Sequence, residues 1–401
     1  MVTDYNNFFN INEQTQNFIR QHIKDDSYLL ALAVKQNSEI NIRFALEQIA
    51  ARQQTKEKIP SWYLNDKLVF PPRISLEQCS SEITAKYKAS LCKGENFADL
   101  TGGSGIDFSF ISQNFNNSFY VEKDEYLSKL AKYNFDILGL KNINIINCSS
   151  DKFLENAANF DCIYIDPSRR KNNKKEILIE NCSPDILKIK DIILKKSKSI
   201  LIKLSPVFDI VELERKLNNI TQIHVVAVKN ECKELLVRLE QNNEKANIEI
   251  VCVNMTGKSR QIFSFNPVDE KNNEYDFVQN VQRYLYEPNA AVQKSGGFKS
   301  VAKKFNLKAI NASSKIYTSD IFINDFCGRI FIVENVFSFN KTELKNNLKN
   351  IKQANITVRN FPLSVAGLRK KLNIADGGDI YLFATTLFDG GKVIVKCRKD
   401  I

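Results

Sequence analysis

The chain has 401 residues, of which 43% are hydrophobic and 26% charged, and this length is enough for two or three domains that each bury a core. It contains no run of about 18 apolar residues, which a membrane-spanning helix requires, and its first residues do not have the pattern of a signal peptide. Nine scattered cysteines without a C-x-x-C pair, and only two histidines, argue against a disulfide framework and a zinc site. We therefore expect a cytoplasmic protein with no metal and no membrane association.

The formal net charge of +11 favours a polyanionic partner. Asn, Lys and Ile are abundant throughout, so a biased composition would produce the same charge without any binding role. The distribution favours binding, because residues 331–401 hold twelve Lys and Arg against six Asp and Glu, which is +6 of the +11. This basic end of the chain predicts a nucleic acid as the partner.

The first part of the chain is predicted to be helical. Apolar residues recur at three- and four-residue spacing over 12–23 and 27–52. A polar connection with three prolines, which interrupt helices, follows at 56–78. A further helix is expected at 80–92, where Ser-Ser-Glu forms a capping signal.

From Phe97 onward, short apolar strands alternate with helical segments. The expected strands are 96–100, 118–122, 143–147, 162–165, 199–203, 224–228 and 234–239. This alternation is typical of βαβ units in a mainly parallel sheet. The last two strands lie close together in the chain, which predicts a hairpin and therefore one antiparallel strand.

After about residue 255 the pattern loosens into a small α+β unit, or two. A helix interrupted by Gly296 and Gly297 is expected over 284–305. The later elements are expected to be strands at 329–339, 355–361 and 379–397, the last with an Asp-Gly-Gly hairpin turn, and helices at 341–353 and 362–372.

The strongest motif is FADLTGGSGIDFSFI, in which a strand ends at Asp99 and a glycine-rich turn leads into a helix. Gly103 and Gly105 are needed there because a side chain would obstruct the approach of the backbone to a ligand. The next strand ends in Glu122, whose carboxylate can accept both ribose hydroxyls of a nucleoside cofactor. A glycine turn alone could be an ordinary strand-to-helix connection, but the acidic strand end at this spacing indicates a nucleoside site.

Two features favour a methyl donor over a dinucleotide. Phe108 occupies the place of the third glycine of G-x-G-x-x-G, and Asp99 suits a ligand with a cationic amino-acid group better than a pyrophosphate. A Walker lysine is missing, which argues against ATP. We therefore predict S-adenosylmethionine as the cofactor, with Thr101 and Lys123 beside the motif residues in its binding site.

The third strand ends in polar residues that can contact an adenine. Asp151, or the backbone of Ser149 and Ser150, is the candidate for that contact. The same residues also suit the N-terminal cap of the following helix, and the two roles are compatible.

The acceptor site is predicted at the end of the fourth strand, in DCIYIDPSRR, because open α/β sheets bind ligands at the carboxyl ends of their strands. The carboxylate of Asp166, and backbone carbonyls fixed by Pro167, can hold an exocyclic amine in line with the methyl group. Ser168 and Arg169 complete the candidate catalytic set, and the paired arginines suit a phosphate or a guanine edge. The alternative is an Asp-Pro pair that only ends a strand. The fifth strand brings Lys203 to the same edge.

Covalent C5 methylation of a pyrimidine would require a cysteine nucleophile. Ser205 stands at the rim of the fifth strand, Cys162 lies within an apolar strand, and Cys182 is the one loop candidate. This mechanism is therefore disfavoured.

Taken together, these segments resemble the bacterial class I methyltransferases that carry a C-terminal THUMP-like domain. The resemblance rests on PSWYLNDKLVFPPRISLEQCSSEITAKYKASL, DLTGGSGID, DPSRR, NECKELLVRL, YLYEPNAAVQKSGGF, YTSD, RNFPLSVAGLRKKL and GGDIYLFATT.

In two places the chain departs from the pattern of this family. Similar amino-methyltransferases carry Asp-Pro-Pro and an aromatic residue where this chain has Ser168 and Arg169, so simple stacking on a base is not predicted. Cys327 replaces the proline of a Phe-Pro-Gly-Arg segment.

The resemblance implies an α/β fold whose middle part is a Rossmann-like methyltransferase domain. The implied domains are a helical N-terminal region at 1–85, the Rossmann-like domain at 86–255, a ferredoxin-like segment at 256–330 and a THUMP-like RNA-binding domain at 331–401. THUMP domains are associated with tRNA-modifying enzymes, so the resemblance implies RNA as the partner. In the terminal unit, Arg359, Arg369, Lys370 and Lys371 are candidates for phosphate contacts, with a solvated helix face as the alternative.

We therefore predict an S-adenosylmethionine-dependent RNA methyltransferase that acts on tRNA or rRNA, with an exocyclic nitrogen of guanine as the acceptor. One alternative is a methyltransferase of DNA or protein, for which the basic residues of the THUMP-like unit would be dispensable. The other is an RNA-binding protein with a degenerate methyltransferase fold, and the intact Asp99, Glu122 and Asp166 argue against it.

Overall fold

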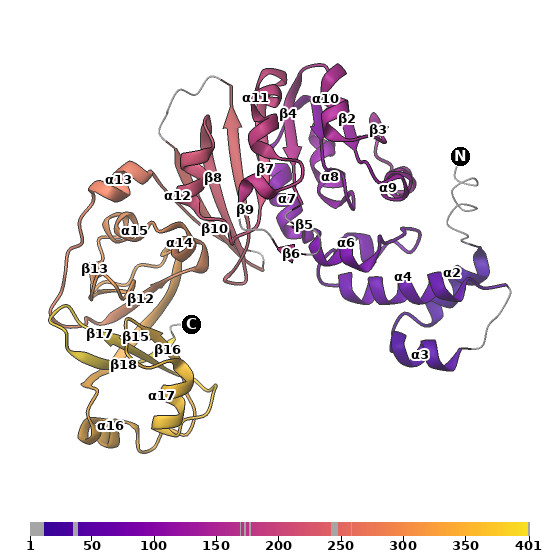
Figure 1. Ribbon diagram of the computed structural model, residues 1–401. Coiled ribbons are helices and arrows are strands. Elements are labelled where there is room, and N and C mark those ends of the chain that lie inside the picture. The colour runs from indigo at the N-terminus through magenta and orange to yellow at the C-terminus, as the bar shows by residue number, and fades with distance from the viewer. Residues whose placement is uncertain are drawn as a thin grey trace. The chain divides into compact units, whose positions relative to one another are not determined.

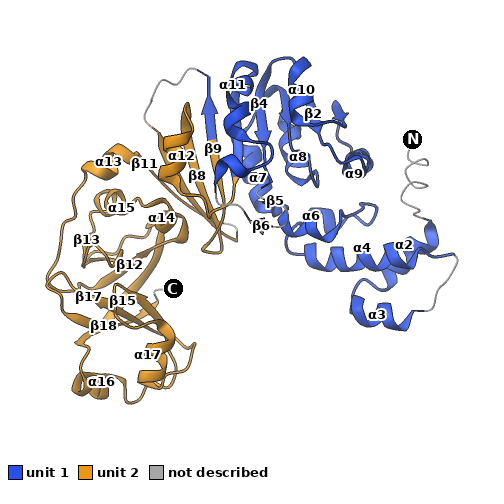
Figure 2. Cartoon of the chain, in the orientation of Figure 1, with its two compact units in different colours: residues 1–203, 238–243 blue, residues 204–237, 244–401 orange. Residues whose placement is uncertain are grey.

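The structure is a computed structural model that describes residues 12–34, 39–168, 170–171, 174–175, 178–241, 248–257 and 259–399. The chain forms two compact units, one of residues 1–203 and 238–243 and the other of residues 204–237 and 244–401 (Figure 2). Within the described ranges, every helix is too short or too polar to span a bilayer.

The first unit begins with short helices. They are α2 (Glu13–Gln21), α3 (Ser27–Ala33), α4 (Ile42–Thr55), α5 (Pro60–Tyr63), α6 (Arg73–Gln78) and α7 (Glu82–Leu91) (Figure 1). Helix was predicted throughout 27–52, but in the described part of this stretch α3 ends at Ala33 and a separate second helix begins at Ile42. Asn41 begins the second, α4, because its side-chain oxygen accepts a hydrogen bond from the N–H of Phe44. The expected capping signal of α7 is confirmed, since the Ser81 hydroxyl accepts from the N–H of Thr84.

A parallel sheet forms the centre of the first unit. Its strands are β1 (Gly94–Asp99), β2 (Phe115–Val121), β3 (Ile143–Ile146), β4 (Phe160–Ile165) and β7 (Ser197–Leu204). They follow the order β7-β4-β1-β2-β3, and every neighbouring pair is parallel. The five strands predicted for this region are confirmed.

Helices cover both faces of this sheet. They are α8 (Ile106–Ile111), α9 (Glu125–Ile137), α10 (Ser150–Asn156) and α11 (Ile186–Lys196). The ring of Tyr120 packs on Phe108 of α8 and Phe135 of α9, with ring centroids 5.3 and 5.4 Å away. The preceding Phe119 packs on Phe153 of α10, because successive side chains of a strand point to opposite faces. The predicted α/β, Rossmann-like architecture is therefore confirmed.

The strand order reverses at β1. β2 and β3 extend from one side of β1, and β4 and β7 extend from the other. Asp99 at the end of β1 pairs with Tyr164 near the end of β4. Open sheets of this kind bind ligands at such a reversal, outside the carboxyl ends of the strands. After β4 comes an antiparallel ribbon that was not predicted, formed by β5 (Arg170–Lys171) and β6 (Lys174–Lys175).

The second unit begins with strands in the order β11-β10-β8-β9, and residues 238–240 at the end of β9 belong to the first unit. Its first elements are α12 (Ile210–Lys216), β8 (Ile220–Val228), β9 (Glu231–Glu240), β10 (Glu249–Thr256), β11 (Ser259–Phe265) and α13 (Pro267–Asn272). Lys229 and Asn230 join β8 to β9 with φ of 50° and 63°, as in a type I′ turn, which confirms the predicted hairpin. The antiparallel pairing of β10 with β11 was not predicted.

The rest of the second unit is built on a sheet of order β13-β14-β12-β15-β18-β17-β16. Its elements are β12 (Tyr284–Pro288), α14 (Ala290–Ser295), α15 (Phe298–Lys304), β13 (Lys308–Ala309), β14 (Tyr317–Ser319), β15 (Gly328–Ser338), α16 (Lys341–Leu348), β16 (Asn355–Arg359), α17 (Val365–Leu372), β17 (Ile380–Thr386) and β18 (Lys392–Lys399).

The prediction of helix over 284–305 was wrong at its start. The segment opens with β12, which pairs antiparallel with β14 and β15. Gly296 ends α14 with a φ of 80°, so the predicted interruption of the helix is confirmed. The strands and helices expected after residue 328 are also present. The domain boundaries drawn from the sequence stay predictions.

Candidate active site

The glycine-rich turn lies at the carboxyl end of β1. Gly103 and Gly105 have φ of 56° and 74°, in the left-handed region that favours glycine. The N–H of Gly103 donates to Oε2 of Glu122 at 2.7 Å, so the turn is tied directly to the acidic end of β2. The two glycines thus form the predicted turn, and their contact with a donor molecule stays a prediction.

Gly102 is a third glycine that the turn requires, and the sequence analysis did not identify it. A Cβ at this position would lie 2.3 Å from Cε2 of Tyr120. The hydroxyl of Tyr120 donates to the carbonyl of Gly103 at 2.8 Å, which holds the ring under the turn. Gly102 is therefore needed for packing, and the Gly-Gly pair in the sequence was the available signal.

Asp99 is a buried carboxylate with an unused oxygen. Its side chain is 1% exposed, and Oδ1 accepts hydrogen bonds from the N–H and the hydroxyl of Thr101 at 2.9 and 3.3 Å. Oδ2 has no hydrogen-bond partner in the part of the chain that the structure describes. Burial raises the pKa of Asp99 well above its ordinary range. An incoming ammonium group would compensate this buried charge, so the residue fits the amino-acid part of S-adenosylmethionine.

Glu122 lies at the end of β2, facing the turn. Each of its oxygens accepts one backbone N–H, Oε2 from Gly103 and Oε1 from Asp124 at 2.8 Å. A carboxylate oxygen has lone pairs for a second hydrogen bond, so Glu122 can also accept ribose hydroxyls. Lys123 and Asp151 are both exposed.

The cap of α10 is Ser149, whose hydroxyl accepts from the N–H of Lys152 at 3.4 Å. Of the residues predicted to cap this helix, Ser149 is therefore the one that does so. Asp151 lies in the first turn of the helix, and its contact with an adenine stays a prediction.

Asp166 lies directly after β4 and is held at two points. Its N–H donates to the hydroxyl of Thr101 at 2.7 Å, and its Oδ2 accepts from Nζ of Lys203 at 2.6 Å. Oδ1 has no hydrogen-bond partner among the described residues, and the side chain is 38% exposed. Since the Thr101 hydroxyl also donates to Oδ1 of Asp99, it connects the Asp99 carboxylate to the backbone N–H of Asp166.

The other residues of the candidate acceptor site differ in their environment. Pro167 is buried and Ser168 is exposed. The N–H and carbonyl of Ser168 form hydrogen bonds of 2.8 Å with the backbone of Ser183, which anchors the loop. Arg169 lies outside the described residues.

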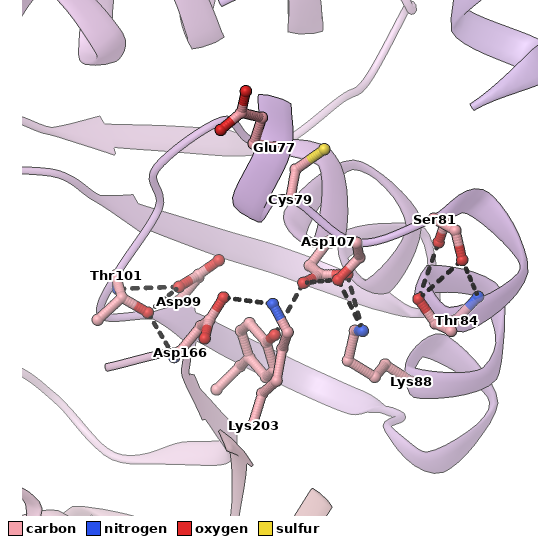
Figure 3. Close-up of polar contacts among 12 residues, drawn as sticks. Glu77, Cys79, Ser81, Thr84, Lys88, Asp99, Thr101, Asp107, Asp166 and Lys203 are labelled. Atoms are coloured by element: carbon pink, nitrogen blue, oxygen red, sulfur yellow. Dashed lines mark hydrogen bonds and ion pairs between the residues drawn. The ribbon is translucent and has the colours of Figure 1, made fainter. Parts of the chain in front are cut away.

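A buried polar cluster adjoins these residues, and sequence reasoning missed it (Figure 3). Lys88 is fully buried, with Nζ 3.2 Å from Oδ1 of Asp107. Oδ2 of Asp107 accepts from the hydroxyls of Ser80 and Tyr164 at 2.7 and 2.8 Å. Burial alone would raise the pKa of Asp107, but the charges of Lys88 and Lys203 and these two hydrogen bonds outweigh burial and lower it. Asp107 stands in the DLTGGSGID motif, whereas no local pattern connects Lys88 to it.

The cysteines near the sheet are poorly placed for covalent catalysis. Cys162 and Cys182 are 3% and 5% exposed, and the Sγ of Cys162 lies 3.4 Å from the Sγ of Cys92. The contact with Cys92 and burial raise the pKa of Cys162 well above its ordinary range. This environment disfavours the thiolate that C5 methylation of a pyrimidine would need.

The four basic residues proposed for RNA contacts fall into two groups. Arg359 donates to Oε1 of the buried Glu287 at 2.8 Å, and Arg369 pairs with Asp376. Lys370 and Lys371 are exposed on α17, the latter with Nζ 4.6 Å from the ring centroid of Phe339. The two lysines therefore present their charge to solvent, whereas both arginines have carboxylate partners within the protein.

A doubly wound sheet with a glycine-rich turn and two carboxylates at its reversal point defines an α/β enzyme with a nucleoside-cofactor site. Family models match three parts of the chain: a THUMP domain-like model residues 328–399, a ferredoxin-like domain model residues 284–326, and the model of conserved hypothetical protein 95 residues 82–227. A candidate methyltransferase from Porphyromonas gingivalis W83 is similar over 98% of this chain and 100% of its own, with 31% identity and a TM-score of 0.88. The chain belongs to the class I S-adenosylmethionine-dependent methyltransferases that carry a C-terminal THUMP-like domain.

Two smaller structures match parts of the chain. An rRNA methylase from Streptococcus thermophilus matches 40% of this chain and 97% of its own, with 15% identity and a TM-score of 0.30. A candidate methyltransferase from Streptococcus mutans, in complex with SAH, matches 40% of this chain and 96% of its own, with 13% identity and a TM-score of 0.31. A search of curated proteins gave no match.

Proposed function

We propose that this methyltransferase acts on RNA, with tRNA or rRNA as the substrate and an exocyclic nitrogen of guanine as the acceptor. The observation that carries the proposal is the unused Oδ1 of Asp166, which lies at the carboxyl end of β4. The backbone N–H of the same residue is linked to the Asp99 carboxylate through the Thr101 hydroxyl. An oxygen at this place can accept one N–H of an amine and so direct the nitrogen lone pair toward the methyl group.

The donor side of the proposal uses the residues around the turn. S-adenosylmethionine, when bound, supplies an electrophilic methyl group on a positively charged sulphur. The Asp99 carboxylate takes the ammonium group of the donor, and Glu122 accepts its ribose hydroxyls. The proposed donor site is completed by Thr101, Gly103, Gly105, Lys123 and Asp151.

The chemical step is a direct displacement. The acceptor nitrogen forms a bond to the methyl carbon while the carbon–sulphur bond breaks, and the electron pair of that bond stays on sulphur. The nitrogen becomes positively charged and then loses its N–H proton to solvent. Asp166, which accepts a hydrogen bond from this N–H, stabilises the positive charge as it develops. Pro167, Ser168 and Arg169 complete the proposed acceptor site.

Three observations support RNA as the substrate. The THUMP-like match covers residues 328–399, and the net charge of the chain is +11. Lys370 and Lys371 are exposed on α17, where they can contact phosphates without reading the sequence. Arg359 and Arg369 would add to this surface through the parts of their side chains that remain exposed.

The test is transfer of labelled methyl from S-adenosylmethionine to separated tRNA, rRNA, DNA and protein from a strain that lacks this protein. We expect label in an RNA fraction and an N-methylated guanosine in its nucleoside digest. Asp166→Ala should abolish the transfer while S-adenosylhomocysteine still binds. Label in DNA or protein, or none in RNA, would contradict the proposal.

A further inference from the structure

Two lysine–aspartate pairs join β4 to β7, one at each end of the strands. At the amino ends, Nζ of Lys198 lies 2.7 Å from Oδ1 of Asp161. At the carboxyl ends, Nζ of Lys203 lies 2.6 Å from Oδ2 of Asp166. The regular parallel register of the two strands brings each lysine beside its aspartate. The same geometry thus occurs twice on one pair of strands.

The two pairs differ in burial. The Lys198 side chain is 80% exposed, and such a surface pair contributes only about 0–1 kcal/mol to stability. The Lys203 side chain is 12% exposed, so its ammonium group has lost most of its water, and this desolvation offsets much of the attraction. A stabilising role therefore does not explain why a lysine is buried at this end.

Lys203 also limits the orientations that Asp166 can take. The Lys203 ammonium group donates to Oδ2 of Asp166 and leaves Oδ1 unused. The backbone N–H of Asp166 donates to the Thr101 hydroxyl, which fixes the backbone at this point. In Figure 3 the ammonium group lies between Asp166 and Asp107, and its charge acts on Asp107 as well. The charge of Lys203 therefore acts on two carboxylates, Asp166 by a direct ion pair and Asp107 through space.

We propose that Lys203 is a positioning residue for methyl transfer, which fixes the Asp166 carboxylate so that Oδ1 faces the acceptor nitrogen. This inference rests on the proposed acceptor role of Asp166. A carboxylate held through one oxygen presents the other in a single direction, whereas an unpaired one would rotate and spend part of its time misdirected. The effect should therefore fall on the chemical step and leave the binding of donor and RNA intact.

The experiment compares Lys203→Met with Lys198→Met, which removes the corresponding lysine at the opposite end of the same strands. The probe is RNA from cells that lack this protein. Lys203→Met should lower kcat by roughly 100-fold, as expected for a misplaced reacting group, with the KM for RNA and the Kd for S-adenosylhomocysteine nearly unchanged. Lys203→Arg should recover part of kcat, and Lys198→Met should behave as the wild type.

Asp166→Asn separates a failure of this inference from a failure of the proposed function. If Asp166→Asn is inactive and Lys203→Met keeps full kcat, the positioning role is overturned while the acceptor role of Asp166 stands. If Asp166→Asn is fully active, the acceptor role itself fails. A loss of donor binding or of thermal stability in Lys203→Met that accounts for its lower activity would show a structural role and overturn the inference.

A crystal structure of Lys203→Met with S-adenosylhomocysteine supplies a readout that needs no RNA. We expect the Asp166 carboxylate to turn or to occupy several orientations. An unchanged carboxylate in that structure would also overturn the positioning role.

Discussion

Lys88 and Asp107 form a buried ion pair that joins α7 to the first turn of α8, with 3.2 Å between Nζ and Oδ1. Ser80, just before α7, adds a second connection, because its hydroxyl donates to Asp107 and accepts from Lys88. Since α8 begins directly after Gly105, these contacts fix the helix that follows the glycine-rich turn. The segment before β1 is therefore part of the support of the candidate donor site.

Replacing Lys88 by methionine should destabilise the protein strongly. The change leaves the Asp107 carboxylate buried without its nearest cation, a loss that costs roughly 3–5 kcal/mol in free energy of unfolding. Urea unfolding measures the effect. Lys129→Met is the control, because its pair with Glu125 is exposed and contributes at most about 1 kcal/mol. Equal effects of the two changes would contradict the importance of the buried pair.

The contribution of Asp107 to stability should disappear in acid. Its pKa in the folded protein is lowered, so the carboxylate stabilises the fold at pH values above the ordinary carboxyl pKa of about 3.9. Below that pH the unfolded chain takes up a proton first, and the stabilisation is lost as the pH falls through the lowered pKa. The difference in free energy of unfolding between wild type and Asp107→Asn should therefore be constant near neutrality and shrink in acid. A difference that does not change with pH would contradict this assignment.

The sequence predicted the position of the candidate site because parallel strands place their carboxyl ends at one edge of a sheet. Asp99, Glu122 and Asp166 each end or follow a strand, so the alternating pattern was sufficient to bring them together. It did not reveal that Lys88 pairs with Asp107. That pairing depends on how α7 packs on α8, and packing between helices has no local signature.

The start of β12 was mispredicted for a related reason. Residues 284–288 begin with a short continuous apolar run, Tyr-Leu-Tyr, in which periodicity does not distinguish a helix from a strand. Their conformation is decided by β14 and β15, which follow later in the chain and pair with them on both sides. A short segment with such ambiguous spacing takes the structure that its distant partners impose.

Gly102→Ala should loosen the donor turn. The new Cβ would lie within 2.3 Å of Tyr120, which is packed against Phe108 and Phe135 and has no space to move. Overpacking of this kind costs roughly 1–3 kcal/mol in stability, and affinity for S-adenosylhomocysteine should fall as well. Gly367→Ala, in α17, is the control, because its Cβ would meet only Ser364 at 3.4 Å. Thermal unfolding and titration calorimetry measure the two effects, and wild-type behaviour of Gly102→Ala would refute the packing role.

Exchanging Lys370 and Lys371 for glutamine should weaken RNA binding without changing stability. Exposed lysines release counterions when they meet phosphates, so the slope of log K against log salt should become shallower by about one for each lysine that binds a phosphate. Arg359→Gln offers a contrast. It removes a partner of the buried Glu287 and should lower stability by roughly 1–3 kcal/mol. The test is the affinity for RNA measured over a series of salt concentrations. An unchanged slope in the double lysine variant would show that α17 does not contact RNA.

Binding of the donor should be linked to the ionisation of Asp99. Because burial raises the pKa of this carboxyl in the free protein, part of the population is protonated at pH values where an ordinary carboxyl is fully ionised. The ammonium group of the donor binds the carboxylate form, so binding releases a proton below the raised pKa. Affinity for S-adenosylhomocysteine, which carries the same ammonium group, should therefore increase with pH until that pKa is passed and then level off.

Titration calorimetry in buffers of different ionisation heats counts the protons released on binding. Asp99→Asn should bind roughly 10- to 100-fold more weakly, since a hydrogen bond between charged groups contributes about 1.5–3 kcal/mol, and should release no proton. Glu122→Gln is the matched control. It removes a carboxylate on the other side of the turn, so it should weaken binding and keep the pH dependence. If Asp99→Asn retained the full proton release, the titrating group would be a different one, and the ammonium group would have to be held elsewhere.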